Sequence, residues 1–195
     1  TTRTTGCARV SLDNAQAYGR QEIVIETPDH VKELEDLGVE HIIQVLKAYA
    51  ERTAEIAKDM RMQYVLIFKN SGGAAGASLI HSHSQIFATE FLPPHIFDKC
   101  QKVQEYKIRH GKCIYCEVWR KESQGPRQVF EDEHMVAFCP YAPMHNYEIW
   151  LMPKRHLDNV THLSGVERLC LAKTLKRVLQ KLHALGLPYN YYFHQ

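Results

Sequence analysis

The sequence predicts an α+β fold, because strand-like and helix-like patterns both recur in each half of the 195-residue chain. Alternating or continuous apolar runs typical of strands lie at residues 21–26, 63–69, 128–130, 135–138, 147–152 and 189–194. Apolar residues recur at amphipathic-helix spacing over residues 39–60 and again over residues 166–185. A third helix is predicted over residues 96–110, after the Pro93-Pro94 break. With 45% hydrophobic residues, the chain can bury a core between such elements.

The two halves of the chain look like copies of one module. In each half a strand ends in proline and histidine, as Pro28-Asp-His30 and as Pro153-Lys-Arg-His156. A long helix and an aromatic-rich strand then follow at nearly the same distance. The polar first 19 residues look like the tail of a preceding unit, and the second copy stops where the first begins a glycine loop. We therefore expect a portion of a longer protein, truncated at both ends. The predicted modules are residues 1–110 and residues 111–195.

Composition and charge argue against several classes of protein. The net charge is +2 and the basic residues form no dense tract, which gives little reason to expect nucleic acid or membrane binding. No apolar run approaches the ~20 residues of a membrane span, and no signal-peptide pattern is present, so we expect a cytoplasmic protein. The six cysteines are irregularly spaced, which favours thiols and metal ligation over a disulfide framework.

A glycine-rich loop follows the apolar run that ends at Phe68. Its sequence from Asn70 is NSGGAAGAS. Gly72, Gly73 and Gly76 lack a Cβ and can adopt positive φ, so successive backbone N–H groups can converge on an anion. A phosphate group is the usual ligand of such a nest.

Two histidines and a glutamine follow this loop in a predicted extended segment. Its period of two places His81, His83 and Gln85 on one face. The opposite face would carry Ser82, Ser84 and Ile86. A single histidine in a strand is more often structural, but two imidazoles buried without a role would cost desolvation free energy. The combination with the glycine loop therefore predicts a functional site.

The pattern Asn-x-Gly-(x)3-Gly-x-Ser-x-x-His-x-His-x-Gln resembles the active-site signature of the galactose-1-phosphate uridylyltransferases, a branch of the histidine-triad superfamily. The family usually has proline between the histidines, whereas Ser82 looks like the related branch that includes ADP-glucose phosphorylase. The resemblance covers nearly the whole chain. It implies two tandem modules, each a mostly antiparallel sheet with a packed long helix. It also makes a homodimer an expectation.

The resemblance further implies a covalent nucleotidyl-histidine intermediate and a ping-pong mechanism. His83 would attack the α-phosphorus of a sugar nucleotide and expel the sugar 1-phosphate. Gln85 would donate a hydrogen bond to phosphate, and a carboxamide cannot serve as a general base for water, which suits a transferase. The expected substrate-binding residues are Asn70, Gly72, Gly76, Ala77, Ser78 and Gln85.

A Cys-x-x-Cys motif formed by Cys113 and Cys116 opens the second half. Alone it could be a redox pair or half of a zinc site. We favour zinc, because no thioredoxin-like setting with the first cysteine at a helix N-terminus is evident. The resemblance implies that His156 ligates the same zinc.

The resemblance implies a second zinc site in the first half. There His30 and His81 would bind the metal together with a Cys-x-x-Cys pair that precedes this chain. Cys7 could replace one missing ligand.

The predicted activity is transfer from UDP-glucose to a hexose 1-phosphate, as in a galactose-1-phosphate uridylyltransferase. ADP-glucose phosphorylase is the alternative, and the Cys-x-x-Cys motif at Cys113 and Cys116 favours this branch. The partners would be a sugar nucleotide and a sugar 1-phosphate or phosphate. Two other classes stay open. One is a nucleotide-binding module without turnover. The other is a histidine-triad enzyme acting on DNA ends, which would need a basic tract or zinc finger that this sequence lacks.

Overall fold

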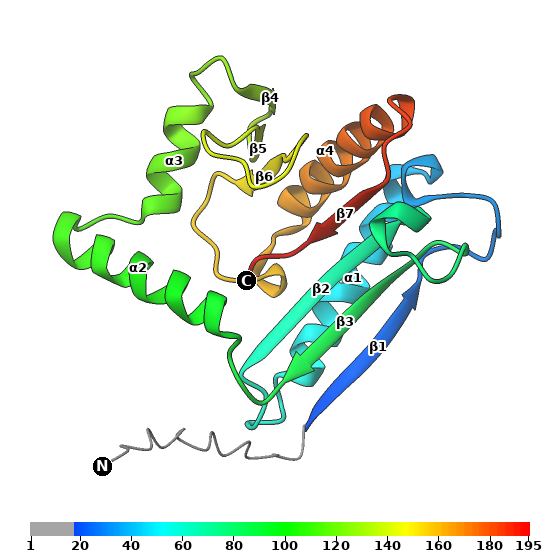
Figure 1. Cartoon of the computed structure of the whole chain (residues 1–195), viewed down its shortest axis with the longest axis horizontal. Coiled ribbons are helices and arrows are strands. Elements are labelled where there is room, and N and C mark those ends of the chain that lie inside the picture. The colour runs from blue at the N-terminus through cyan, green and yellow to red at the C-terminus, as the bar shows by residue number, and fades with distance from the viewer. Residues whose placement is uncertain (1–17) are drawn as a thin grey trace, which may run out of the picture.

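The computed structural model describes residues 18–195 and shows two sheets with four helices packed around them (Figure 1). The strands are β1 (Gly19–Ile25), β2 (Tyr64–Ser71), β3 (His83–Thr89), β4 (Gln128–Glu131), β5 (Met135–Phe138), β6 (Trp150–Pro153) and β7 (Tyr189–Tyr192). The helices are α1 (Val39–Ile56), α2 (Pro94–His110), α3 (Ile114–Glu122) and α4 (Gly165–Ala184). Within this part of the chain, every helix is too short or too polar to cross a membrane.

The larger sheet has four antiparallel strands in the order β1-β3-β2-β7. β2 pairs with β3 as far as Phe68, opposite Gln85, and then continues along β7 to Ser71. β3 instead follows β1 back to its first residue, His83, opposite Ile25. The two central strands therefore separate at the end of the sheet that carries the predicted site.

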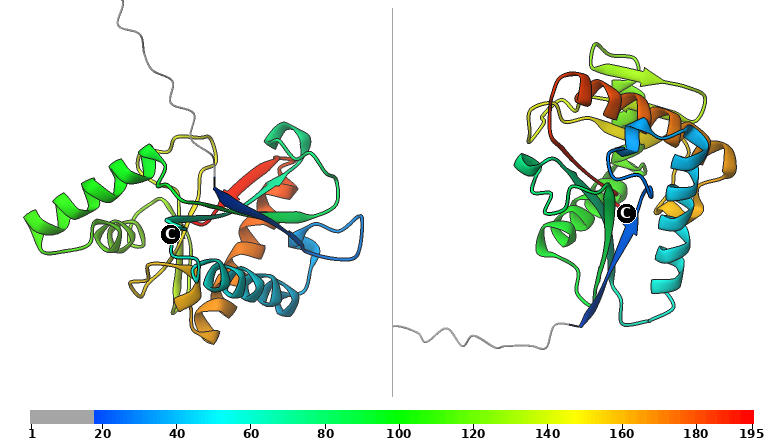
Figure 2. Two further views of the ribbon diagram at one scale, coloured as in Figure 1. Left: turned by 90° about the horizontal axis from the view of Figure 1, so that it is seen from below. Right: turned by 90° about the vertical axis from the view of Figure 1, so that its right-hand side faces the viewer.

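One hydrophobic core lies between this sheet and the two long helices. α1 runs along one face of the sheet, and α4 packs against α1 (Figure 2). Leu46 of α1, Ile67 of β2 and Ile86 of β3 are completely buried in this core, with Leu175 and Leu179 of α4 beside them. Each such side chain contributes about 1.5–3 kcal/mol to folding. The helix periodicity in both halves thus serves one shared core.

The smaller sheet has three antiparallel strands in the order β4-β5-β6. All four residues of β5 are buried, because α3 and α4 both pack against this strand. α2 and α3 form the arm on the left of Figure 1. The antiparallel α+β class predicted from the sequence is confirmed.

Two predicted elements differ from the structure in their bounds, and one helix was not predicted. The first long helix ends at Ile56 rather than at residue 60, because the chain turns where Met62 N–H bonds to the Asp59 carbonyl. The predicted strand over residues 147–152 begins at Trp150, since Tyr147 has a φ of 60° that no strand accommodates. α3 was not predicted, because its nine residues are too few for a clear periodic signal.

The predicted division into modules at residue 110 stays a prediction. β7 comes from the second predicted module and pairs with β2 from the first, so the larger sheet draws strands from both halves. The predicted N-terminal tail, apart from its last two residues, and the suggested ligand Cys7 lie outside the described residues.

Candidate active site and metal centres

β3 presents His83 and Gln85 on the face of the larger sheet that points away from α1. Ser84, between them, is fully buried and its hydroxyl contacts Tyr49 of α1. The alternation predicted for these residues is therefore present. The predicted start of the strand was wrong by two residues, because His81 lies in a bend that precedes β3.

A hydrogen bond fixes the tautomer of His83. Its Nδ1 lies 2.8 Å from the carbonyl oxygen of His81. Since a carbonyl oxygen can only accept, Nδ1 of the neutral ring carries the proton and Nε2 keeps the lone pair. Nε2 is therefore the nucleophilic atom of this imidazole.

The carboxamide of Gln85 is oriented by a neighbour on β1. Gln21 Nε2 donates to Gln85 Oε1 at 3.0 Å. Because its oxygen is already bonded, Gln85 keeps its own NH₂ group to donate to a phosphate oxygen. Gln21 was not among the predicted site residues. It lies diagonally from Gln85 in the register that pairs Ile23 with Gln85, and such a contact requires knowledge of the register.

A cavity of about 210 Å³ lies beside the glycine loop. Several predicted site residues line it, namely Asn70, Gly72, Ala77, Ser78, His81 and His83. Gly76 and Gln85, which were also predicted to bind substrate, are not part of this lining. Ligand sites of this kind usually enclose about 300–1,000 Å³, so the cavity can hold only part of a sugar nucleotide.

The glycine loop has a positive φ at two of its three glycines, and it differs from a simple anion nest. Gly72 and Gly76 have φ of 88° and 83°, in the region that favours glycine. However, the N–H groups of Ala75, Gly76 and Ala77 donate to carbonyl oxygens within the loop itself. These three groups are not free for an anion, which leaves the other loop amides and the Asn70 side chain.

His30 and His81 face each other through their Nδ1 atoms, which are 2.8 Å apart. On the other side of the ring, His81 Nε2 lies 2.6 Å from the carbonyl oxygen of Thr27. Nε2 of His81 therefore carries the proton, and its Nδ1 lone pair points at His30. Zinc-bound histidines commonly donate their second N–H to a backbone carbonyl in this way. The 2.8 Å between the two Nδ1 atoms is a hydrogen-bond distance. Two nitrogens on a tetrahedral zinc would lie about 3.3 Å apart, so the rings would have to separate slightly to share a metal.

Cys113, Cys116 and His156 come together in the second half. Their ligating atoms lie within 4.8 Å of one another, and Cys116 Sγ is 3.3 Å from His156 Nδ1. Burial, followed by the neighbouring Cys113 thiol, raises the pKa of Cys116, whereas a bound metal favours the thiolate. Cys113 caps the N-terminus of α3, so the predicted absence of a helix N-terminus was wrong. The proximity of His156 is what favours a metal over a redox pair.

Residues 2–93 match the family model of the galactose-1-phosphate uridyl transferase N-terminal domain. The chain is 36% identical over 179 residues to ADP-glucose phosphorylase of Arabidopsis thaliana, covering 91% of this chain and 50% of the relative. It is 33% identical over 183 residues to galactose-1-phosphate uridylyltransferase of Thermotoga maritima, covering 92% of this chain and 57% of the relative. The chain belongs to the galactose-1-phosphate uridylyltransferase family.

The likeness to this family extends to its solved structures. The crystal structure of ADP-glucose phosphorylase from Arabidopsis thaliana with bound ADP-glucose matches with a TM-score of 0.85 at 36% identity. That match covers 91% of this chain and 56% of the other. The chain spans about half the length of the curated relatives it matches.

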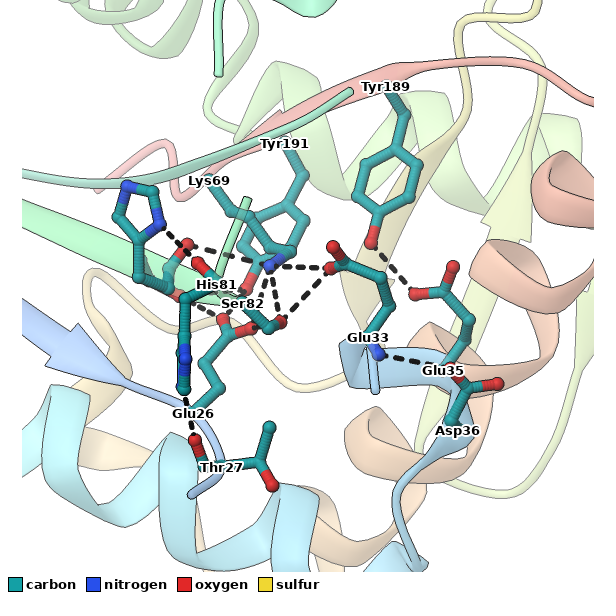
Figure 3. Close-up of polar contacts among 12 residues, drawn as sticks. Glu26, Thr27, Glu33, Glu35, Asp36, Lys69, His81, Ser82, Tyr189 and Tyr191 are labelled. Atoms are coloured by element: carbon teal, nitrogen blue, oxygen red, sulfur yellow. Dashed lines mark hydrogen bonds and ion pairs between the residues drawn. The ribbon is translucent and has the colours of Figure 1, made fainter. Parts of the chain in front are cut away.

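Ser82, which stands where the uridylyltransferase family usually has proline, enters a buried ionic network (Figure 3). Lys69 Nζ lies 2.9 Å from the Ser82 hydroxyl and 2.7 Å from the Glu26 carboxylate. Glu33 approaches the same ammonium group to 3.1 Å. Lys69 and Glu26 are each only 1% exposed. This network was not predicted from the sequence, although a charge near the end of each of two apolar runs, Glu26 after β1 and Lys69 in β2, was a signal for it.

The second oxygen of Glu26 connects the network to both halves of the chain. Its hydrogen-bond partners are Ser84, the Tyr49 hydroxyl at 3.4 Å and the Tyr191 hydroxyl at 3.5 Å. Burial raises the pKa of both tyrosines far above the usual range, so both stay protonated. Because Tyr191 belongs to β7, the polar layer behind β3 includes a strand from the second half.

Proposed function

We propose that this family member is a nucleotidyltransferase that acts on sugar nucleotides through a covalent intermediate on His83. The observation that carries the proposal is the His83 ring, whose Nδ1–H is bonded to the His81 carbonyl while Nε2 keeps its lone pair. The ring lines the cavity of the glycine loop, so this lone pair is available beside a site suited to phosphate.

In the proposed first step, His83 Nε2 attacks the α-phosphorus of the sugar nucleotide. The new N–P bond forms as the bond from that phosphorus to the oxygen of the sugar 1-phosphate breaks, and the sugar 1-phosphate leaves with the electron pair. The hydrogen bond from Nδ1 to the His81 carbonyl becomes stronger as the ring becomes positive. Asn70 and Ser78, which line the cavity, would donate to the phosphate oxygens, on which charge develops.

In the proposed second step, an oxygen of the acceptor phosphate attacks the same phosphorus and the N–P bond breaks. Gln85, with its NH₂ group free, would stabilise the phosphorus oxygens in both steps. Because a carboxamide cannot take a proton from water, it does not promote hydrolysis of the intermediate. The chemistry of position 85 thus supports transfer rather than hydrolysis.

We also propose that the two ligand clusters hold zinc. One would use Cys113, Cys116 and His156, and the other His30 and His81, each completed by ligands beyond these residues. Zinc in these positions would serve as a structural ion that holds distant segments together. His81 Nε2 is bonded to the Thr27 carbonyl and Nδ1 faces His30, so a metal held by Nδ1 would leave His81 no free lone pair for attack.

We propose UDP-glucose as the nucleotidyl donor and a hexose 1-phosphate such as galactose 1-phosphate as the acceptor, since the matching family model and two relatives at 33% identity are galactose-1-phosphate uridylyltransferases. ADP-glucose with phosphate as acceptor is the second candidate. Two observations favour this second candidate, because Ser82 and the Cys113-Cys116 pair both resemble the phosphorylase-like branch. The relative at 36% identity is also an ADP-glucose phosphorylase.

Intact mass spectrometry of the protein after incubation with UDP-glucose or with ADP-glucose tests the proposal. A uridylyl increment would support the first donor, and an adenylyl increment the second. Each increment should disappear when the matching acceptor, galactose 1-phosphate or phosphate, is added. Binding of either nucleotide without any increment would instead support a nucleotide-binding module and would overturn the proposed catalysis.

A further inference from the structure

We infer that Lys69 is a positioning residue for this reaction. Its contact with Ser82 fixes the turn between His81 and His83, and this turn orients the His83 ring. The inference rests on the proposed role of His83. It adds Lys69, which lines the glycine-loop cavity together with Ser82 and His83 but whose ammonium group is paired with Glu26 and Glu33. Lys69 is buried beside Glu26 and Ser82 (Figure 3). Ser84, which precedes Gln85 on β3, contacts Glu26 and Tyr49 of α1, so this polar layer lies on the α1 side of β3.

Lys69 lies at the fork where the two central strands of the sheet separate. Backbone pairing between β2 and β3 reaches Phe68 and goes no further towards the loop. The next side chain along β2 is Lys69, whose Nζ lies 2.9 Å from the Ser82 hydroxyl and 3.5 Å from the His83 carbonyl oxygen. One side chain thus connects the two strands across the base of the glycine loop, where the backbone ladder has ended.

The ammonium group of Lys69 is itself held in place. A buried charge is costly unless it is paired and hydrogen-bonded, and Glu26 at 2.7 Å and Glu33 at 3.1 Å supply that pairing. Glu26 also holds Ser82 at a second atom, because the Glu26 N–H donates to the Ser82 carbonyl oxygen at 3.1 Å. Ser82 is therefore fixed both through its side chain and through its backbone.

This fixation reaches the nucleophile through one peptide group. The carbonyl oxygen that accepts from His83 Nδ1 belongs to the peptide between His81 and Ser82. If the peptide group between His81 and Ser82 can rotate, its carbonyl oxygen no longer accepts from His83 Nδ1, and the proton of the His83 ring can move to Nε2. An Nε2 that carries the proton has no lone pair for phosphorus. Lys69 thus determines which nitrogen of His83 is nucleophilic.

The test compares Lys69→Met and Ser82→Ala with a matched control in the intact protein. Arg127→Met is the control, because Arg127 bonds the buried Glu122 at 2.8 and 2.9 Å, and neither residue lines the glycine-loop cavity. Nitrogen-15 NMR of labelled histidine, at one pH and without substrate, reports the tautomer of His83. The protein and the Arg127→Met control should show a proton on Nδ1 alone, whereas Lys69→Met should show a mixture.

A second readout is the single-turnover rate of adduct formation with UDP-glucose and ADP-glucose. Lys69→Met should slow it by about 10²-fold with the dissociation constant of the nucleotide unchanged, since misplacement of a reacting group by 1 Å has that effect. Ser82→Ala, which removes the contacts of this hydroxyl with Lys69, Glu26 and Glu33 but leaves the Lys69 ion pairs, should slow it by about tenfold. The double variant should be no slower than Lys69→Met, because both changes act through the same contact.

An unchanged His83 tautomer in Lys69→Met would overturn the inference, and so would strictly additive rate losses. If Lys69→Met does not fold, Ser82→Ala decides by the same two readouts, because it leaves the buried ion pair intact. Absence of any adduct in the unaltered protein would contradict the proposed function, whereas the tautomer comparison would still decide the role of Lys69.

Discussion

Each half of the chain has a histidine shortly after a strand, but the neighbours of that histidine differ between the halves. His30 follows β1 and meets His81, which comes from the glycine motif. His156 follows β6 and meets the thiols Cys113 and Cys116. The glycine loop and His83 occur in the first half, and residues 111–195 contain no second loop of this composition. In both halves the histidine after the strand is thus suited to metal ligation. The first half differs because His83 and the glycine loop lie where β2 and β3 separate.

The largest difference between the halves should appear when their histidines are removed. His83→Ala should reduce turnover to background, a loss on the order of 10⁶-fold, as is known for the removal of an enzymatic nucleophile. Metal content and folding should be nearly unchanged, because His83 belongs to neither ligand cluster. Steady-state rates and zinc analysis of the variant check both statements. His156→Ala should give the opposite pattern, with zinc lost from the second half, and equal losses of turnover in the two variants would refute this separation.

Replacement of Gln85 should have a smaller effect on the same half. Gln85→Ala should still form the adduct but about 10²-fold more slowly, since one preoriented donor to the phosphorus oxygens is lost. Gln85→His should raise hydrolysis of the adduct, because an imidazole can accept a proton from water. Rapid-quench measurement of adduct formation and decay separates the two effects. An unchanged rate of adduct formation in Gln85→Ala would show that Gln85 does not stabilise the phosphorus oxygens.

Loss of a zinc ligand in the second half should lower both the zinc content and the thermal stability of the protein. Cys113→Ala should lower the zinc content by one equivalent and reduce the midpoint of thermal unfolding, because metal binding to the folded site is also folding free energy. His30→Ala should do the same for the first site. Metal analysis after dialysis, with Cys170→Ala as a control outside both clusters, makes the comparison. Zinc content that is unaltered by Cys113→Ala would rule out the second site.

The smallest effect concerns a second buried carboxylate. Arg155 lowers the pKa of Glu167 from 4.5 to about 2, a shift that burial partly opposes. The resulting stabilisation is complete above about pH 4.5 and is lost as the pH falls through 2. Arg155→Met should therefore lower the free energy of unfolding at neutral pH, and it should lower it less in acid, where the Glu167 carboxylate is protonated. Urea unfolding at several pH values measures this, and a cost independent of pH would contradict the assignment.

Much of the fold could be predicted because its signals are local. The strand around Ile67 and the helices α1 and α4 follow from apolar periodicity, and the alternation of His83 with Ser84 follows from the pleat. The pairing of β7 with β2 could not be predicted, since it depends on how the halves pack.

The supporting residues of the site were harder to predict than its reactive ones. Gln21 reaches Gln85 through a strand register that no single segment specifies. Lys69 and Glu26 lie far apart in sequence, at the ends of apolar runs, where a charge is usually interpreted as an exposed strand end. Their burial becomes apparent once Ser82 and the fork between the strands are located in space.

The most direct test of the central claim is to locate the nucleotidyl group within the protein. After incubation with UDP-glucose or ADP-glucose, tryptic digestion at alkaline pH should release residues 70–99, which contain both histidines of the motif. Tandem mass spectrometry can then separate His81 from His83 by fragmentation at the intervening serine. The account predicts the whole increment on His83, with none in the His83→Ala protein. An adduct on His81, or full turnover by His83→Ala, would contradict it.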